Sequence, residues 1–447
     1  MPKNVLVLGA GMISPPLLRY ILSRTDARVV VGALDISKAE QVLSEYPHGR
    51  AVQLDVQDTA ALTPFVNEAD VVVSLLPAGY NARIAELAIA RRIPMLNTSY
   101  VAPSLAALDG AAKQAGVLIL SETGLDPGLD HMSTVRLVRR VRATGGRIER
   151  FVSCCGGFPA PDANNNPWGY KFSWFPRQVL LSGRSPARYL RGGQIVDVPG
   201  PELYAHAWPY AIDDLGVFEI YPNRDSVQYR NMYGLADADG LLRATLRYPG
   251  WCATLKAAAD LGWTDIDTHQ WAPGTTYADV SSHLLPAGAG TLIDRLAGKL
   301  GLSSDSEVLS RLEWAGLLSD RHIGTTSAAP IDLFVNRLAA LMMYKPGERD
   351  MIVMEHRLNV AFPDGHTEEI TSTLTTTGEP WGDSAMSRTV ALPIAVATRL
   401  VLNNAIDEIG VQVPIQPDIY RPVLDELANL GLAFRDERHI RYVSPLA

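Results

Sequence analysis

Residues 5–14 read VLVLGAGMIS, a strand-like apolar run that leads directly into a glycine turn. Gly9 permits a tight turn from strand to helix, and Gly11 lets the backbone approach a pyrophosphate. The free N–H groups of the helix that follows then face that negative charge. Ser14 stands where a third glycine is common, and two prolines follow it, which the first turn of a helix tolerates. The segment predicts a dinucleotide-binding turn, and a purely structural turn is the alternative.

Asp35 is the first acidic residue after the second apolar run, residues 29–34. A carboxylate about twenty residues beyond the glycines accepts hydrogen bonds from the adenine ribose hydroxyls and repels the additional phosphate of NADP. We therefore expect NAD as the cofactor, with NADP as the alternative. A second interpretation treats Asp35 as a loop carboxylate that caps a helix beginning near Ser37.

The composition favours a protein that acts on small molecules. The 447 residues are 47% hydrophobic and 20% charged, enough for two or three domains with a sizeable core. A formal charge of −8, a pI near 5.6 and the lack of a long Lys/Arg cluster argue against nucleic acid or an anionic membrane as a partner. Three cysteines without disulfide or metal spacing, an N-terminus without a signal-peptide pattern and no apolar run of about 18 residues predict a cytoplasmic protein.

Strand-like runs alternate with amphipathic segments through the first 120 residues. The runs are residues 5–8, 29–33, 51–54, 71–76, 94–97 and 117–120. This alternation predicts an α/β fold with a doubly wound, Rossmann-type parallel sheet, which binds ligands at the carboxyl ends of its strands. The cofactor-binding residues expected at those ends are Gly9, Gly11, Met12, Ile13, Ser14, Asp35, Asp55, Val56, Leu76, Ser99 and Leu125.

The pattern changes beyond residue 130. It predicts a helix at 133–142, a strand at 150–154, a loop rich in Gly, Pro and Asn at 156–169, a helical stretch at 290–318, antiparallel strands at 351–360 and 368–376, and a helix at 385–405 bent near Pro393. The loop stands out, because long ordered loops in compact enzymes are commonly functional.

Several motifs occur together in one order along the chain. They are TSYV at 98–101, GLDPGLDH at 124–131, CGGFPAP at 155–161, NPWGYKFSW at 166–174, YPNRDS at 221–226, TLRY at 245–248 and GERD at 347–350. In these motifs the chain resembles the saccharopine dehydrogenase family, in its glutamate-forming branch, over essentially its whole length. The resemblance implies a dinucleotide-binding domain of residues 1–130 plus about 385–447. It also implies an inserted α+β domain for substrate binding and dimerisation at 131–384, with a helical subdomain at about 250–320, and a homodimer.

The reaction implied by this resemblance is the oxidation of the secondary amine of saccharopine, a step of lysine metabolism. Hydride leaves the carbon beside the bridging nitrogen, and water splits the imine into glutamate and 2-aminoadipate semialdehyde. The chemistry needs a cofactor held face-on to one carbon, cations for three carboxylates, and groups that manage protons on nitrogen and water.

Candidate residues exist for each of these tasks. The resemblance implies a substrate-binding set of Ser99, Tyr100, Asp126, Arg224, Thr245, Leu246 and Arg247. Arginines bind carboxylates in bidentate fashion. The alternatives are a turn residue for Arg224, a solvent-facing strand residue for Arg247, and a helix N-cap before Pro103 for Ser99.

Three residues are candidates for catalysis: Tyr100, Asp126 and Cys155. Asp126 follows the sixth strand and is suited to orient the substrate amine, although an Asp-Pro-Gly turn also explains it. Cys155 is either near the reacting carbon or a small buried hydrophobe. His131 is expected to cap or pack, and we expect no metal, since the nine histidines form no metal-binding pair.

Two features depart from the family pattern. The family branch commonly uses NADP and carries basic or small polar residues where this chain has Asp35, which sets the resemblance against the carboxylate argument. The segment after Trp174 is bulkier than expected, which predicts a reshaped pocket for a related substrate. A carboxynorspermidine-like amine is therefore an alternative substrate, and a cofactor-binding sensor without turnover is the alternative from another functional class.

Overall fold

The computed structural model describes residues 2–441, which divide into two compact units. The first unit comprises Met1–Ile148, Asn231–Ala236 and Val360–Ala447, and the second comprises Glu149–Arg230 and Asp237–Asn359. The first unit contains a seven-stranded sheet, and each unit has its own apolar core.

The first unit is built on a seven-stranded parallel sheet in the order β17-β6-β5-β4-β1-β2-β3. Its strands are β1 (Asn4–Leu8), β2 (Arg28–Ala33), β3 (Gly49–Gln53), β4 (Val71–Ser74), β5 (Met95–Asn97), β6 (Leu118–Leu120) and β17 (Gly410–Gln412). The strand order reverses between β1 and β4, as in a doubly wound fold. The predicted α/β class is confirmed, with β17 as an additional strand that pairs with β6.

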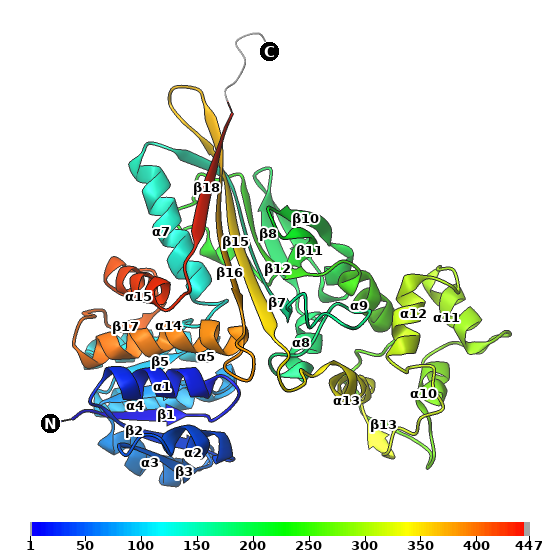
Figure 1. Cartoon of the computed structure of the whole chain (residues 1–447), viewed down its shortest axis with the longest axis horizontal. Helices are drawn as coiled ribbons and strands as arrows, with labels where there is room; N and C mark the ends of the chain where they lie inside the picture. Colours follow the sequence, from blue (N-terminus) through cyan, green and yellow to red (C-terminus); the bar gives the residue numbers. More distant parts are fainter. Residues whose placement is uncertain (1, 442–447) are drawn as a thin grey trace. The chain divides into compact units, whose positions relative to one another are not determined.

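Helices surround this sheet (Figure 1), and their contacts with one another divide them into two groups. The first group is α1 (Ser14–Arg24), α2 (Ser37–Leu43) and α14 (Ala385–Leu402); the second is α3 (Thr59–Glu68), α4 (Asn81–Arg91), α5 (Pro103–Ala106) and α6 (Asp109–Ala115), with the short turn η1 (Ala78–Tyr80). Leu6 and Leu8 of β1 share one apolar cluster with Leu62 of α3 and Ile84 of α4. By length and composition, α14 is the one helix among residues 2–441 that qualifies as a membrane span, but 78% of its apolar window is buried inside the protein.

The first unit extends further along the chain than the sequence motifs suggested. Its remaining elements are α7 (Leu129–Ala143), β16 (Thr367–Thr377), α15 (Pro417–Asn429) and β18 (Arg435–Arg441). Helix α7 packs against α15, and β16 pairs antiparallel with β18. These contacts place the unit limits at 148 and 360, whereas the predicted domain limits were 130 and 385.

The second unit combines a mixed sheet with a group of helices. Its strands are β7 (Arg147–Pro159), β8 (Ala187–Arg191), β9 (Gln194–Val198), β10 (Trp208–Ile212), β11 (Gly216–Pro222), β12 (Gly240–Arg247), β13 (His269–Gln270), β14 (Ser327–Ala328) and β15 (Asp350–Ala361). Its helices are α8 (Pro176–Ser182), η2 (Gly200–Ala205), η3 (Val227–Tyr229), α9 (Trp251–Asp260), α10 (Tyr277–His283), α11 (Leu292–Leu300), α12 (Glu307–Trp314) and α13 (Pro330–Met342). The first part of the predicted loop at 156–169 is strand, because β7 continues to Pro159.

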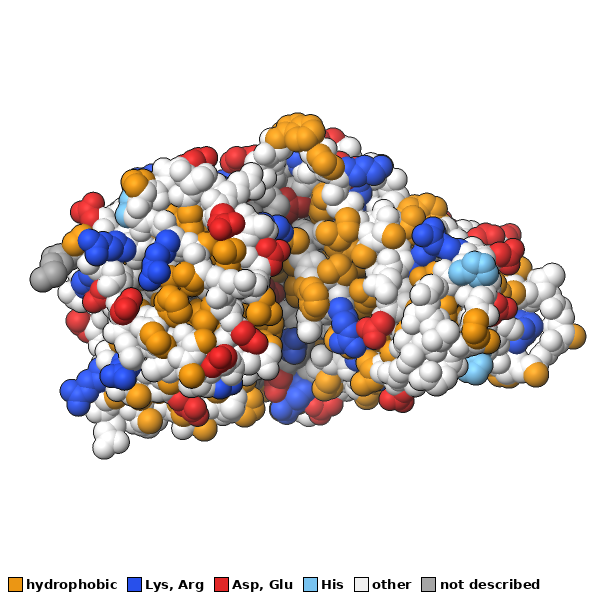
Figure 2. Space-filling view, turned by 90° about the horizontal axis from the view of Figure 1, so that it is seen from below, with side chains coloured by type: hydrophobic (Ala, Val, Ile, Leu, Met, Phe, Trp, Pro, Cys, Tyr) orange, Lys and Arg blue, Asp and Glu red, His pale blue; other side chains and the backbone are white. Residues whose placement is uncertain are grey.

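One face of the protein carries both signs of charge. Figure 2 shows acidic and basic side chains interspersed with apolar ones on the face that it presents. Among the described residues on that face, Figure 2 shows no continuous basic stripe of the kind with which proteins attract nucleic acids.

A nearly buried ion pair lies in the second unit, between two of the motifs. The Lys171 ammonium, whose side chain is 3% exposed, lies 2.5 Å from Glu348 Oε2. Partial burial by itself would raise the pKa of Glu348, but hydrogen bonds from Lys171, the Lys345 N–H and Asn165 lower it to about 2. The pair therefore ties the NPWGYKFSW segment to the GERD turn.

We expect Glu348→Gln to lower the free energy of unfolding by about 3 kcal/mol at neutral pH, because it leaves a buried ammonium without its charged partner. Urea unfolding followed by circular dichroism measures this loss. The control is Asp260→Asn, which breaks the more exposed Lys256–Asp260 helix pair in the same unit and should cost at most about 0.5 kcal/mol.

The contribution of this ion pair to the free energy of unfolding should also depend on pH. Because the pKa of Glu348 is depressed on folding, its stabilising contribution is present above its ordinary value of 4.5 and is lost as the pH falls toward about 2. The difference between parent and variant should therefore shrink over that window, and an equal difference at about pH 3 and pH 7 would contradict the assignment.

Candidate active site

The predicted dinucleotide turn forms at the carboxyl end of β1. Gly9 has a φ of +105°, and its N–H donates to the Gly32 carbonyl at 2.9 Å. A Cβ at Gly11 would meet nothing within 4 Å, so its backbone is open to a ligand. Ser14 is fully buried, and its hydroxyl donates to the Gly11 carbonyl at 2.9 Å. This bond holds the turn closed and explains why serine is accommodated in place of a third glycine.

The other predicted cofactor residues follow the neighbouring strands of the same sheet. Asp55 and Val56 follow β3, Leu76 follows β4, and Ser99 follows β5. Because parallel strands end at one edge, these residues gather there with Met12 and Ile13 of the glycine turn. The Ser99 hydroxyl donates to the Leu76 carbonyl at 3.4 Å. The N-cap interpretation of Ser99 is wrong, since α5 begins after Ala102.

Asp35 is exposed just beyond β2. Its Oδ1 accepts hydrogen bonds from the Ser37 N–H at 3.0 Å and the Ser37 hydroxyl at 2.7 Å. These bonds lower the pKa of Asp35, so the carboxylate is charged at neutral pH. The capping interpretation is confirmed in part: the side chain bonds to the first residue of α2, but Ile36 occupies the N-cap position itself.

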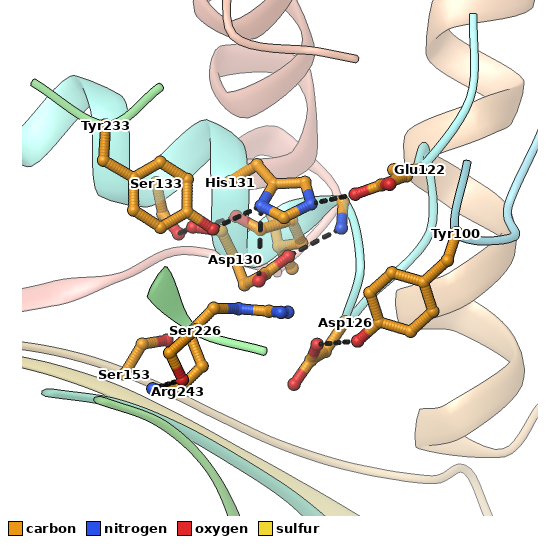
Figure 3. Close-up of polar contacts among 12 residues, drawn as sticks. Tyr100, Glu122, Asp126, Asp130, His131, Ser133, Ser153, Ser226, Tyr233 and Arg243 are labelled. Carbon is orange, nitrogen blue, oxygen red and sulfur yellow. Dashed lines mark hydrogen bonds and ion pairs between the residues drawn. The ribbon is translucent and has the colours of Figure 1, made fainter. Parts of the chain in front are cut away.

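Tyr100 and Asp126 come together in the first unit. The Tyr100 hydroxyl donates to Asp126 Oδ1 at 3.1 Å (Figure 3). Asp126 lies in a tight turn, in which a Cβ on Gly128 would lie 2.2 Å from the Gly124 nitrogen. Leu125, which precedes Asp126, is buried. The structure thus joins two of the three predicted catalytic residues at the end of the sheet.

A buried network beside this pair was missed by the sequence analysis. The carboxylate of Glu122 lies 2.7 Å from His131 Nε2, and His131 Nδ1 contacts the Tyr233 hydroxyl (Figure 3). Asp130 Oδ1 accepts from the Gly128 N–H at 2.6 Å. His131 is fully buried, which confirms the expectation that it packs, but nothing in the pattern near Glu122 indicated its partners.

In the second unit, Arg247 is buried among aromatic rings. The side chain lies at the end of β12, and the residue is only 7% exposed. The guanidinium carbon lies 5.2 Å from the ring centre of Tyr170 and 5.6 Å from that of Trp251. Burial alone would lower the pKa of Arg247, but the nearby hydroxyls of Tyr221, Tyr170 and Tyr204 outweigh it, so the pKa is raised. The solvent-facing interpretation of Arg247 is therefore wrong.

Several donors around Arg247 lack partners. The Nε of Arg247, the hydroxyl of Tyr204 and the Nε1 of Trp251 are buried without a hydrogen bond to any residue that the structure describes. Buried polar groups normally have partners, because an unmet donor costs about 1–3 kcal/mol. A cationic side chain in this condition is suited to receive an anion.

The remaining predicted residues of this unit differ in exposure. Arg224 is exposed on the loop after β11, with a φ of +53°, and its carbonyl accepts from the Arg188 N–H. Cys155 is buried on β7, opposite Thr245 of β12, and Leu246 is fully buried. Burial raises the pKa values of the Cys154 and Cys252 thiols far above the ordinary range.

Arg243 and Phe175 of this unit differ sharply in exposure. Arg243, which the sequence analysis did not single out, is 1% exposed, stacks over Tyr229 at 4.5 Å, and donates its backbone N–H to the Ser226 hydroxyl (Figure 3). Phe175, in the bulky segment after Trp174, is 61% exposed and precedes α8.

Comparison with known proteins identifies the family. Residues 5–120 match the model described as "Saccharopine dehydrogenase NADP binding domain", and residues 124–432 match "Saccharopine dehydrogenase C-terminal domain". The chain is 34% identical, over 97% of its length and 98% of the relative, to saccharopine dehydrogenase [NADP(+), L-glutamate-forming] of Schizosaccharomyces pombe. It is 36% identical to the Saccharomyces cerevisiae protein of that name, over 96% of this chain and 97% of that one.

Two other comparisons extend this result. Mitochondrial alpha-aminoadipic semialdehyde synthase of Bos taurus is 34% identical over 98% of this chain, which spans 48% of that longer protein. The structure of apo saccharopine dehydrogenase (L-Glu forming) from Saccharomyces cerevisiae superposes with a TM-score of 0.88, covering 98% of this chain and 100% of that one at 34% identity. This chain therefore belongs to the saccharopine dehydrogenase family.

Proposed function

We propose that this chain is a saccharopine dehydrogenase of the glutamate-forming type. A nicotinamide dinucleotide, which Gly9, Gly11 and the residues after β2 to β5 would hold, would supply the hydride acceptor for the carbon beside the bridging nitrogen of saccharopine. Water then adds to the imine carbon, and cleavage of the carbon–nitrogen bond releases glutamate and 2-aminoadipate 6-semialdehyde, with one proton and the reduced cofactor as the other products. The names of the full-length relatives support this proposal.

The observation that carries the proposal is the buried guanidinium of Arg247 with its unmet Nε donor. A family substrate with three carboxylates supplies an anion for such a site, and the Tyr204 hydroxyl and Trp251 Nε1 are further donors for it. The exposed Arg224 is suited to a second carboxylate. Thr245 and Leu246 flank Arg247 on the strand and stay predicted substrate contacts.

Tyr100 and Asp126 are the residues that we assign to the substrate amine. The substrate nitrogen loses its extra proton to water, because hydride leaves only when the nitrogen lone pair is free to form the imine. The Asp126 carboxylate, oriented by the Tyr100 hydroxyl, accepts a hydrogen bond from the remaining N–H and sets the direction of the carbon–hydrogen bond. Cys155 stays a candidate without an assigned step. The homodimer and the cytoplasmic location also stay predictions.

For the cofactor, we propose a preference for NAD. The charged, exposed Asp35 just beyond β2 supports it, because a carboxylate at this position would accept hydrogen bonds from the adenine ribose hydroxyls of NAD and would repel the 2′-phosphate of NADP. Against it stand the relatives named for NADP(+) and the NADP-binding family model. Lys38, whose charge contributes to lowering the pKa of Asp35, is the cation nearest in sequence that would favour a phosphate.

The first test is the initial rate of reduced-cofactor formation at 340 nm with saccharopine, run in parallel with NAD and NADP. We expect turnover with both and a higher kcat/KM with NAD. Faster turnover with NADP would keep the reaction and overturn the cofactor proposal. Dinucleotide binding without turnover would favour the sensor alternative, and turnover only with a carboxynorspermidine-like amine would favour the other substrate.

Replacing Asp35 tests the cofactor argument directly. We expect Asp35→Ser to shift the ratio of kcat/KM values toward NADP by about 10-fold or more, since it removes the repulsive charge and a ribose hydrogen-bond acceptor. Asp70→Ser is the matched control, because it removes an equal charge next to Asn4, at the opposite edge of the sheet. An unchanged ratio in Asp35→Ser would show that this carboxylate does not select the cofactor.

Replacing Arg247 tests the anion site. We expect Arg247→Met to lower kcat/KM for saccharopine by about 1,000-fold or more, through loss of a buried bidentate contact, while the Kd for the dinucleotide stays within about two-fold. Arg150→Met, at a largely exposed arginine of the same unit, should leave both constants unchanged. A loss below about 10-fold in Arg247→Met would remove Arg247 from the substrate site.

A further inference from the structure

Glu122 has an unusual backbone for a buried, charged residue. It follows β6 with a φ of +56°, in the left-handed region that disfavours side chains, and it is only 4% exposed. Strain of this kind costs about 1–3 kcal/mol and persists only where the surroundings hold it in place. The contacts of Glu122 show what holds it.

Glu122 forms hydrogen bonds with the backbone on both sides of Tyr100. Its N–H donates to the Ser99 carbonyl at 3.1 Å, and its Oε1 accepts from the Val101 N–H at 3.0 Å. Its backbone and its side chain therefore bracket Tyr100, whose hydroxyl donates to Asp126. An apolar side chain of the same size would fill the space but would leave the Val101 N–H without this acceptor.

The other carboxylate oxygen of Glu122, Oε2, is the first member of a series of contacts that ends at the turn containing Asp126. It lies 2.7 Å from His131 Nε2, and His131 Nδ1 lies 3.4 Å from Asp130 Oδ2. Asp130 Oδ1 in turn accepts from the N–H of Gly128, two residues beyond Asp126. All of these groups belong to the first unit, and Figure 3 shows them beside the Tyr100–Asp126 pair.

We propose that Glu122, His131 and Asp130 are positioning residues that fix the Tyr100 hydroxyl against the Asp126 carboxylate. At one end of this buried network, Glu122 holds the backbone next to Tyr100. At the other end, Asp130 holds the turn that contains Asp126. Buried polar groups are costly unless each is bonded, and once bonded they specify a single geometry. The kinetic role of this network rests on the proposed function, whereas its geometric role does not.

A double-mutant cycle tests the kinetic role. Glu122→Gln keeps the size of the side chain and an acceptor for Val101 but weakens the contact with His131. We expect it to lower kcat/KM for saccharopine about 10-fold without changing the Kd for the dinucleotide. In a Tyr100→Phe background, the same substitution should cost less than about 2-fold, because residues that act through one another are not additive. A full 10-fold loss in that background would overturn the proposal.

The control is Glu426→Gln, a partly buried glutamate of the same unit that accepts a hydrogen bond from Tyr20. Its kcat/KM should equal that of the parent. If it fell as far as that of Glu122→Gln, the loss would reflect general damage to the unit, and the positioning role would be refuted.

A crystal structure of Glu122→Gln gives a second measurement that needs no turnover. We expect the distance between the Tyr100 hydroxyl and Asp126 to lengthen beyond 3.5 Å, or the Tyr100 side chain to occupy more than one position. An unchanged bond of 3.1 Å would overturn the geometric role. If the parent protein does not oxidise saccharopine, the proposed function fails alone, and this structure still decides whether the network positions the pair.

Discussion

The register of β1 against its two neighbours is the constraint on which the first unit depends. Leu8, the last residue of β1, pairs with Gly32 of β2 on one side and with Ser74 of β4 on the other. Hydrogen bonds then join the Gly9 N–H to the Gly32 carbonyl and the Leu75 N–H to the Leu8 carbonyl. The glycine turn and the residues after β2 and β4 are therefore fixed relative to one another by the backbone, before any side chain contributes.

Two kinds of buried charge have different consequences in this protein. The carboxylate of Glu122 is bonded through both of its oxygens, so it stabilises one arrangement of the backbone around it. The guanidinium of Arg247 is equally enclosed but keeps an unmet donor. Closed networks of polar groups rigidify a structure, whereas an unmet buried donor raises its energy until a ligand supplies the missing acceptor. The fully bonded Glu122 therefore fixes the local geometry, whereas Arg247 has a donor with which to bind an anion.

The features that could be predicted from the sequence are those that local patterns determine, namely the strands, the glycine turn and the helix after it. The six apolar runs, the glycine turn and the following helix were correct, because strand and helix periodicity and turn chemistry act over short distances. The strand β17 was missed, because its three residues lie outside the alternation of strand-like and amphipathic segments that indicated the other six strands. The burial of Arg247 was not evident either, because the aromatic rings around it come from Tyr170, Tyr204 and Trp251, which are distant in the chain or in other elements. Contacts of this kind depend on tertiary structure alone.

The segment Asn231–Ala236 belongs to the first unit, although the chain on either side of it belongs to the second. Its Tyr233 contacts His131, 102 residues earlier in the chain, and the unit is completed only by residues from 360 onward. The first unit therefore cannot finish folding before nearly all of the second unit has been synthesised, because its last parts follow that unit in the chain. Closing so long a loop also makes its assembly slow relative to a domain of local contacts. During synthesis, the unit that contains the glycine turn is thus completed after the second unit, even though β1 is made before any strand of the second unit.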